Sequence, residues 1–564
     1  MKSTDPAGSV TQYEYDADGN IVQNTDAAGH TRAYGYDAMN RLVSFTDALG
    51  DTTTYGYDAN GNLVQKIDAN QKTYAFAYDA RNRLISASDP AGDTLRYGYD
   101  GASHLVQKTD ARGAVTTYAY DALGHLVQVT DPLGGSVVYA YDANGNRISA
   151  TDQRGNTTSY VYDALNRLVK TVNPYGKAVS RAYDAMGRVV SQTDELGGTK
   201  KYSYDAMGRK ITEANELGKT TSYSYDKDGH ILSVTDPLGH VTSYGYDALG
   251  RIVSRTDALG NTRTFAYDAL GNLVGVTDAK GKTYRYSYDE LSRLVAEINK
   301  AGVKESYGYD AVGNLVSKTD FNGLGAQYQY DAAYRLSAVL YADGKKKSYS
   351  YDPDGNLVAA TNEADALSFT YDQDNRLVGL RDGKLNQSES FAYDPAGNRT
   401  GVTWRAGGRT IGYAYGKMNE LLAVTDPEQG KTNFGYDDDL RQIIEEQPDG
   451  VTTKRSYDAA GKITSIVYGE AHGWGNGALV SRAYVYNDDG QKSYEVDASG
   501  HVTAYAYDAD GRLSQVEYPF VEGKKSVDFK ERLGLGLAPA WGARGDQRLR
   551  GIIMSPEFRT ESGG

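Results

Sequence analysis

The chain alternates two short apolar stretches, each followed by a polar turn. A Tyr, followed by Asp in 22 of 24 units, recurs every 21 residues from Tyr15 to Tyr351 and continues with spacings of 20 to 29 residues to Tyr507. The residue two before this Tyr is aromatic in 22 units, and the residue six after it is Leu, Ile or Val in 19. Residues i and i+2 of a strand share a face. Each unit is therefore predicted to carry a Tyr-x-Tyr pair on one strand and to return along a second.

The polar stretches have the composition of tight turns. Four residues after the Tyr lies Gly in 15 units and Asn in five, and these residues accept a left-handed backbone most readily. Asp at the start of a turn can bond the backbone two residues on. A second turn follows the return strand, as in Asp47-Ala48-Leu49-Gly50. We predict type I turns closed by a left-handed residue, with positive φ at Gly19, Gly61, Gly124, Gly145, Gly187 and Asn40.

The pattern predicts an all-β fold. No segment keeps a 3.6-residue apolar stripe over 10–12 residues, so we expect a helix content below about 10%. One unit is too small to fold alone, and about 48 antiparallel strands must twist and coil together. We predict a long spiralling antiparallel sheet, with the Tyr-x-Tyr face packed between or along its turns. A propeller with blades of two units is disfavoured, because nothing distinguishes odd units from even ones.

Composition narrows the class of protein. The 564 residues include 49 Tyr, 10 Phe and no Cys, and the formal net charge is −14. The absence of Cys excludes disulfides, thiolate metal sites and a Cys nucleophile. The acidic balance argues against nucleic acid or an anionic membrane as a partner, and no apolar run approaches the length of a membrane-spanning helix. The repeat contains 41 of the 49 Tyr residues, so the tyrosine excess is part of the periodicity.

The repeated motif resembles a known family. Tyr246-Asp247-Ala248-Leu249-Gly250-Arg251-Ile252-Val253, followed by Thr256-Asp257-Ala258-Leu259-Gly260, is similar to the YD repeat of the Rhs family. That family includes bacterial Rhs polymorphic toxins, wall-associated proteins, cocoon components of insecticidal toxin complexes and teneurins. The resemblance covers about residues 3–518. It implies a β-sheet spiralling into a hollow shell, which in bacterial members encloses a C-terminal toxin for delivery to a competitor or host. An older interpretation of such repeats is binding to carbohydrate at a surface.

Two departures from the family pattern bear on the ends of the chain. Bacterial members that carry a toxin usually have a self-cleaving Asp-Pro-x-Gly motif after the repeats. Here that motif occurs only in repeat turns, for example at Asp5, Asp89, Asp131, Asp236 and Asp394, so no catalytic aspartate is carried over. We expect residues 1–518 to form an array of about 24 units and residues 519–564 to be a divergent, poorly ordered tail. The chain starts within a unit, and we interpret it as a truncated shell or a split gene product.

Other chemical motifs have simpler explanations. Asp142-Ala143-Asn144-Gly145-Asn146 vaguely resembles an acidic calcium loop, but turn capping by Asp is preferred. Gly281-Lys282-Thr283 and Gly218-Lys219-Thr220 lack the earlier Gly of a phosphate loop. The seven His residues are interpreted as scattered and solvent-facing: His30, His104, His125, His230, His240, His472 and His501. We therefore predict no enzyme, and no catalytic, cofactor-binding or metal-binding residue.

The leading functional hypothesis is structural. Rows of Tyr could stack on sugar rings, but we expect them to pack the sheet. An excursion at 470–477, which contains Trp474, is the better candidate for a binding loop. We predict a shell that encloses or presents a C-terminal toxin, with that cargo, the remaining Rhs core and secretion-system or cell-surface components as partners. By resemblance it is secreted or at the cell surface; lacking a leader, it is expected to be cytoplasmic before any export. The alternatives are a surface protein that binds carbohydrate or a receptor, and a fragment without function.

Overall fold

The computed structural model describes residues 1–404, 407–470 and 478–518, which form 49 strands and no helix. The all-β prediction is thus confirmed. The first 25 strands are β1 (Lys2–Thr4), β2 (Val10–Tyr15), β3 (Ile21–Thr25), β4 (Thr31–Tyr36), β5 (Leu42–Thr46), β6 (Thr52–Tyr57), β7 (Leu63–Ile67), β8 (Thr73–Tyr78), β9 (Leu84–Ser88), β10 (Thr94–Tyr99), β11 (Leu105–Thr109), β12 (Val115–Tyr120), β13 (Leu126–Thr130), β14 (Ser136–Tyr141), β15 (Arg147–Thr151), β16 (Thr157–Tyr162), β17 (Leu168–Val172), β18 (Ala178–Tyr183), β19 (Val189–Thr193), β20 (Thr199–Tyr204), β21 (Lys210–Ala214), β22 (Thr220–Tyr225), β23 (Ile231–Thr235), β24 (Val241–Tyr246) and β25 (Ile252–Thr256).

The remaining strands continue the same alternation of a six-residue and a five-residue strand, with longer members near the end. They are β26 (Thr262–Tyr267), β27 (Leu273–Thr277), β28 (Thr283–Tyr288), β29 (Leu294–Ile298), β30 (Lys304–Tyr309), β31 (Leu315–Thr319), β32 (Gly325–Tyr330), β33 (Leu336–Tyr341), β34 (Lys346–Tyr351), β35 (Leu357–Thr361), β36 (Ala366–Tyr371), β37 (Leu377–Asp382), β38 (Gln387–Tyr393), β39 (Arg399–Trp404), β40 (Arg409–Tyr415), β41 (Leu421–Asp426), β42 (Gly430–Tyr436), β43 (Gln442–Glu446), β44 (Val451–Tyr457), β45 (Ile463–Glu470), β46 (Ala478–Tyr486), β47 (Lys492–Asp497), β48 (Val502–Tyr507) and β49 (Leu513–Glu517).

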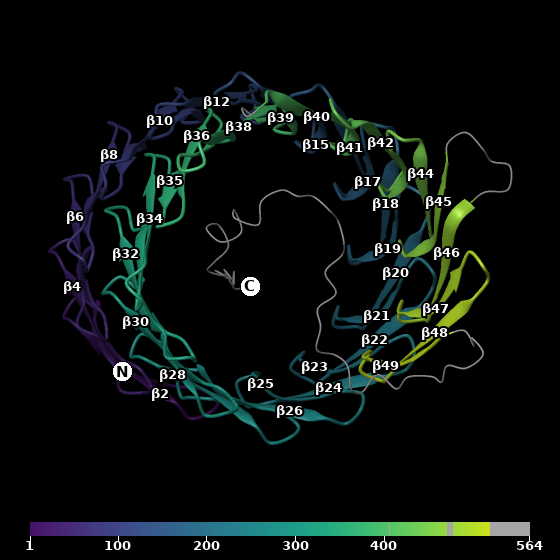
Figure 1. The fold of residues 1–564 in the computed structure, drawn as a ribbon. Coiled ribbons are helices and arrows are strands. Elements are labelled where there is room, and N and C mark those ends of the chain that lie inside the picture. Colours follow the sequence, from purple (N-terminus) through teal and green to yellow (C-terminus); the bar gives the residue numbers. More distant parts are fainter. Residues whose placement is uncertain (405–406, 471–477, 519–564) are drawn as a thin grey trace.

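All 49 strands belong to one antiparallel meander that winds into a spiral. Each strand pairs with the next along the chain, from β1–β2 to β48–β49. The sheet closes on itself as a ring and then continues (Figure 1), so that the loop after β30 meets the loop after β7 and the loop after β48 meets the loop after β25. Every pair of strands with extensive contacts is a pair of consecutive strands. The two turns of the spiral therefore do not pack face to face but meet along their edges. No described strand crosses the middle of the ring in this view.

The turn after each Tyr-x-Tyr strand has the predicted left-handed closure. Backbone φ is 88° at Gly19, 89° at Gly61, 84° at Gly124, 82° at Gly145, 81° at Gly187 and 58° at Asn40. In the Asp37 loop the Asp37 amide donates to the Arg41 carbonyl and the Asn40 amide to the Asp37 carbonyl, both at 3.0 Å. The strand pairing shifts by one residue at Tyr36, which pairs with Leu42. The loop is thus a type I turn followed by a β-bulge.

The Tyr-x-Tyr face is packed along the sheet, without a second layer above it. In the described residues no large side chain is fully buried. The hydroxyl of the second Tyr of a unit donates to a backbone carbonyl of the preceding unit, as Tyr57 does to Leu42 at 2.9 Å. At least 21 units make this bond. Tyrosine, with an apolar ring and a polar tip, therefore joins each unit to its predecessor.

Arginine completes this link between units. The Arg41 guanidinium binds Asp37 of its own turn at 2.8 Å and the Asp58 carbonyl of the next unit at 3.1 Å. The Cζ atom of Arg41 lies 4.7 Å from the Tyr57 ring centroid, a cation–π distance. Stability therefore comes from contacts between neighbouring units, as expected for a repeat array.

The predicted domain boundary near residue 518 stays a prediction. The last described strand, β49, ends at Glu517, and the predicted tail, 519–564, lies outside the described residues. Most of the excursion at 470–477, including Trp474, lies outside them too. It connects β45 and β46, which have eight and nine residues and are the longest strands of the sheet.

Candidate functional site

The feature most distinctive of this fold is the line along which one turn of the sheet meets the next. We call the loops after the Tyr-x-Tyr strands Tyr-Asp loops, and those after the shorter strands return loops. In a meander the two kinds lie at opposite edges of the sheet. Return loops at Asp68 to Asp257, after β7 to β25, face Tyr-Asp loops at Asp310 to Asp508, after β30 to β48. We call this line of facing loops the seam.

The seam keeps a constant register. The β7–β8 loop bonds the β30–β31 loop through Asn70 and Asp310, at 2.9 Å. The β25–β26 loop bonds the β48–β49 loop through the Ala258 amide and Asp510, at 3.1 Å. Both pairs of loops are 23 strands apart. The spacing in residues changes between these points, but the spacing in strands does not, so each return loop has a fixed partner.

Two arginines bind across the seam most extensively. The Arg112 guanidinium pairs with Asp354 at 2.7 Å and donates to the Asp372 carbonyl and the Asn375 side chain, both at 2.6 Å. The Asp354 side chain is only 5% exposed and also accepts the Ala111 amide at 2.9 Å. Arg154, at the equivalent position of its loop, donates to the Gly416 carbonyl at 2.6 Å. These charge-assisted bonds join one return loop to two Tyr-Asp loops.

Tyrosine and lysine side chains add further bonds across the seam. The Tyr334 hydroxyl donates to Asp68 at 2.6 Å, and the Lys72 ammonium lies 3.7 Å from the Tyr334 ring centroid. Burial and the Asp68 carboxylate raise the pKa of Tyr334. Tyr334 occupies the left-handed loop position with φ of 63°, where most units have Gly or Asn. A strained backbone is thus tolerated at a position where the side chain reaches the facing turn.

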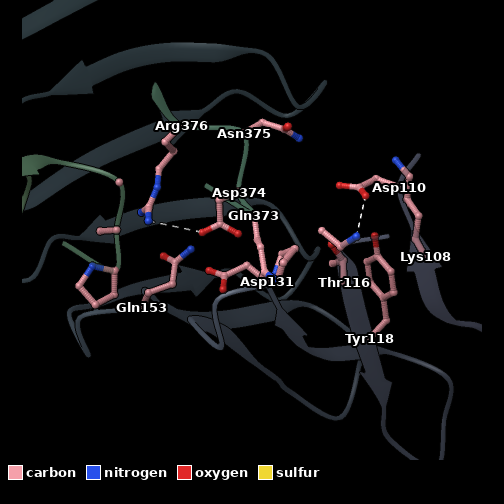
Figure 2. A pocket seen from close by; sticks show the side chains of 15 residues that line it. Lys108, Asp110, Thr116, Tyr118, Asp131, Gln153, Gln373, Asp374, Asn375 and Arg376 are labelled. Atoms are coloured by element: carbon pink, nitrogen blue, oxygen red, sulfur yellow. Dashed lines mark hydrogen bonds and ion pairs between the residues drawn. The ribbon is translucent and has the colours of Figure 1, made fainter. Parts of the chain in front are cut away.

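Acidic residues also meet across the seam. Asp374 and Asp131 come from facing loops and point toward the same space, with Gln153 beside them and Arg376 behind (Figure 2). A polar cavity of about 410 Å³ lies here, and a larger one of about 700 Å³ lies between the return loop at Asn215 and the Tyr-Asp loops at Asp458 and Asn487. Both cavities are lined by loop residues, many of them charged, and by residues of the adjoining strands such as Tyr118 and Tyr484.

The structure places the motifs singled out in the sequence within turns. The Asp142 carboxylate accepts the Asn144 and Asn146 amides, both at 2.9 Å, which supports capping. Gly281 has φ of 75° and precedes β28, and Gly218 has φ of 76° and precedes β22. Both therefore close return loops. The Asp-Pro-x-Gly motifs lie in turns as well, for example at Asp131, whose carboxylate accepts the Gly135 amide at 2.7 Å.

The interpretation of the histidines as scattered was wrong, and of the six that the structure describes only His501, 56% exposed, faces solvent. Each described His lies four residues after the first residue of a loop, and its Nδ1 approaches the carboxylate of that residue at 2.9–3.3 Å. The His104 ring also stacks on Tyr120, with centroids 4.6 Å apart. Three of them, His104, His125 and His230, substitute for the arginine of other Tyr-Asp loops. The common position is visible in the sequence once residues are counted from the loop Asp. His472 lies outside the described residues.

Two groups of three side chains are close enough for a cation to bridge them. Ligand atoms of Asp226, Asp228 and His230, and those of Asp236, His240 and Asp489, lie within 4.8 Å of one another. The histidine in each group is already paired with its loop Asp at 2.9 Å. Acidic clusters of this kind are common without an ion, so neither group is assigned as a metal site.

The fold and the seam define a class of protein: a β-hairpin repeat array wound as a single sheet, with successive turns joined loop to loop. The chain belongs to the RHS repeat family. The model of the RHS repeat matches more than half of the chain, at residues 1–31, 15–44, 36–73, 78–114, 99–136, 141–178, 183–220, 225–262, 267–304, 309–346 and 486–520. The predicted membership of the Rhs family is confirmed. Among curated proteins, no sequence matches the chain.

Several solved structures are similar to the chain. The crystal structure of TcdB2–TccC3 with Cdc42 matches at TM-score 0.47 and 15% identity, over 92% of this chain and 35% of that chain. TcdB2–TccC3 without its hypervariable C-terminal region matches at TM-score 0.46 and 16% identity, over 92% and 35%. The Tc holotoxin pore of Photorhabdus luminescens matches at TM-score 0.35 and 14% identity, over 90% and 43%. This chain thus spans well under half the length of each. Within the described ranges, no helix could cross a membrane.

Proposed function

We propose that the chain is a wall segment of a shell that encloses a polypeptide cargo. The observation that carries this proposal is the seam: successive turns of one sheet are fixed edge to edge by at least ten facing loops. A sheet that only displayed a binding surface would not need its turns closed against each other. Membership of the RHS repeat family supports the same assignment.

The tyrosines support this function over carbohydrate binding. The hydroxyl group of the second Tyr of most units is committed to a backbone carbonyl, as for Tyr99 to Leu84 at 2.9 Å. Ring faces are covered by cations of neighbouring units, as for Arg83 on Tyr99 at 4.8 Å. In this proposal the chain has no catalytic residue, cofactor or metal. Its cargo is a toxin, its partners are the remaining Rhs core and secretion or surface components, and the assembled shell acts outside the producing cell.

Enclosure can be tested with a marker attached to the full chain. One form carries a small unstructured marker with a protease site after Gly564, and a second carries the same marker before Met1. The shell proposal expects the C-terminal marker to be cut many times more slowly than the N-terminal marker. A matched sample unfolded in urea gives the intrinsic cleavage rate of each marker.

Equal cleavage rates for the two markers in the folded protein would contradict enclosure. Binding to a glycan array, lost on substitution of exposed tyrosines such as Tyr175 or Tyr494 (44% and 47% exposed), would favour the surface-binding alternative instead. Electron microscopy of the same sample would show whether the turns form a closed wall or an open sheet.

A further inference from the structure

Three Tyr-Asp loops on the seam carry a buried aspartate at their third position: Asp374, Asp439 and Asp489. Their side chains are 16%, 18% and 15% exposed. In each, Oδ1 is shielded from solvent and has no hydrogen-bond partner. The same loop position in the first turn holds Met39, Leu123, Leu165, Met186 and Met207, which are 66–78% exposed. Five of the ten Tyr-Asp loops on the seam carry Asp at this position, against Asp18 and Asp228 among the fourteen earlier ones.

Each of the three faces a second carboxylate. Asp374 faces Asp131 (Figure 2), Asp439 faces Asp194, and Asp489 faces Asp236. Two carboxylates held together at low solvent exposure repel each other when both are ionised. Loss of that repulsion when one of them binds a proton would strengthen the contact between the two turns.

The nearby cations do not neutralise these pairs. Arg376 lies 3.9 Å from Asp374 but is bound at 2.8 Å to Asp372, and Lys108 and Asp110 line the same cavity. Likewise, Arg441 lies 3.9 Å from Asp439 but is bound at 2.7 Å to Asp437. The nearest other charges there are Glu195, which is acidic, and Lys177, which pairs with Asp438 at 2.9 Å.

The third pair has a titratable partner as well. His240 lies 3.7 Å from Asp489 and 2.9 Å from Asp236. Arg255, Arg263, Arg512, Asp257 and Asp510 line the cavity that these residues share. On the neighbouring loop Lys219 is paired with Asp488 at 2.7 Å. Protonation of His240 would favour ionised Asp489 and oppose the effect of proton binding by the pair, so this pair is expected to respond less than the other two.

We propose that the seam is a proton-sensitive joint, in which the pairs Asp131–Asp374, Asp194–Asp439 and Asp236–Asp489 each take up a proton as the pH falls and then hold the two turns together more tightly. Burial, and then the facing aspartate, raise the pKa of Asp374, Asp439 and Asp489 above the usual range. A carboxyl whose pKa is higher when folded binds protons more tightly in the folded state. Acidification through that pKa therefore stabilises the seam, and the gain is lost as pH rises.

Asp354, at the same loop position, also faces a carboxylate, that of Asp110, but it differs from the other three in having a bound cation. It pairs with Arg112 at 2.7 Å and accepts the Ala111 amide at 2.9 Å. Although burial opposes it, these bonds lower the pKa of Asp354. The substitution Asp→Asn mimics a protonated carboxyl. It should close the seam at the three unpaired positions and weaken it at Asp354.

The absence of native cysteine allows a direct measurement of the seam. Spin labels at Leu133→Cys and Gln373→Cys, two exposed residues of facing loops, report the distance between the turns. Labels at Leu123→Cys and Leu165→Cys, in two loops of one turn, serve as the reference. In the otherwise unchanged chain, the long-distance population of the seam pair should fall several-fold as the pH is lowered from about 8 into the range in which these carboxyls bind protons. The reference pair should not change.

The triple variant Asp374→Asn, Asp439→Asn, Asp489→Asn should be short-distance at both ends of this pH range. Asp354→Asn should raise the long-distance population at both ends and keep the pH response. An unchanged pH response in the triple variant would overturn the proposal. Closure of the seam at pH 8 on addition of calcium chloride would also overturn the proposal if the triple variant no longer showed that closure. The pairs would then bind a cation. A strand-type circular dichroism spectrum, measured for each variant and for Asp374→Asn alone, shows that folding is retained.

Discussion

In the later part of the sheet, the loops at one edge have a constant length and the loops at the other edge vary. On the seam edge, all ten Tyr-Asp loops from Asp310 to Asp508 have the same pair of backbone bonds, from the first residue to the fifth and from the fourth to the first. On the opposite edge the return loops vary: the Asn362 loop is one residue shorter, and β45 and β46 extend the unit that contains the 470–477 excursion. All departures from the 21-residue period fall on this second edge.

The difference shows what keeps the period constant. The ten return loops from Asp68 to Asp257, which lie on the seam, share one set of backbone bonds, and the 21-residue spacing has no exception from Tyr15 to Tyr351. A loop that must fit a facing loop cannot change length without losing its partner. A loop at an unpaired edge is free to change, because a longer loop costs little closure entropy.

The largest effect is expected from inserting Gly-Ser into one loop on each edge. After Arg154 the insertion displaces a guanidinium that is 16% exposed and bonded to Gly416 and Asn419. It should cost about 5 kcal/mol of unfolding free energy. After Asp343, in a return loop of the other edge, it should cost about 0.6 kcal/mol or less. Urea unfolding measures both, and equal costs would remove the seam as the cause of the constant period.

Removal of one seam arginine should have the next largest effect. Arg112→Ala leaves Asp354, 5% exposed, without its cation, so we expect a loss of about 3 kcal/mol. Arg81→Ala serves as the control, since Arg81 is exposed and donates only to the Gly101 carbonyl of the neighbouring loop. Its loss should be about 1 kcal/mol or less. Similar losses for both variants would show that the seam adds nothing beyond the contacts between neighbouring units.

A smaller effect, an increase in the unfolding free energy, is expected on relieving backbone strain at a loop residue whose side chain does not bond across the seam. Leu440 has φ of 61° in its loop, and a left-handed non-Gly residue costs about 1–2 kcal/mol. Leu440→Gly should therefore raise the unfolding free energy by about 1 kcal/mol. Tyr334→Gly relieves the same strain but loses the bond to Asp68, so thermal unfolding should show destabilisation. Stabilisation by both variants would mean that Tyr334 contributes nothing to the seam.

The smallest effect concerns a single exposed turn. The Arg83 side chain and amide lower the pKa of Asp79 to about 2, against about 3.9 in an unfolded chain. The contribution of the capping Asp79 carboxylate to the unfolding free energy is complete above about pH 4 and is lost as the pH falls toward 2. Melting temperatures of Asp79→Asn and the unchanged chain should therefore differ at neutral pH and converge in acid. A difference that grows on acidification would contradict the sign, which is opposite to that of the unpaired seam aspartates.

The strands, turns and left-handed positions could be predicted because residues within one unit determine them. The positive φ of Asn40 and Gly61 could be predicted because each lies four residues after a Tyr, at the position where most units have Gly or Asn. The seam could not be predicted, since its register of 23 strands depends on small twist and coil angles accumulated around the ring. One signal was present: Asp occupies the third loop position at Asp354, Asp374, Asp439, Asp489 and Asp510, where Met or Leu is common in earlier units.

The tyrosine hydroxyl bonds that reach back one unit also determine how the wall would respond to force. Each unit is held by its predecessor through one strand ladder, through such a bond, as for Tyr120 on Leu105 at 3.0 Å, and in many units through a loop arginine, as for Arg41 on Tyr57. Tension along the chain would load the hairpins at an end one after another, because antiparallel ladder bonds lie perpendicular to the strands. The wall would then unravel from its ends by peeling at low force, while its middle stayed intact.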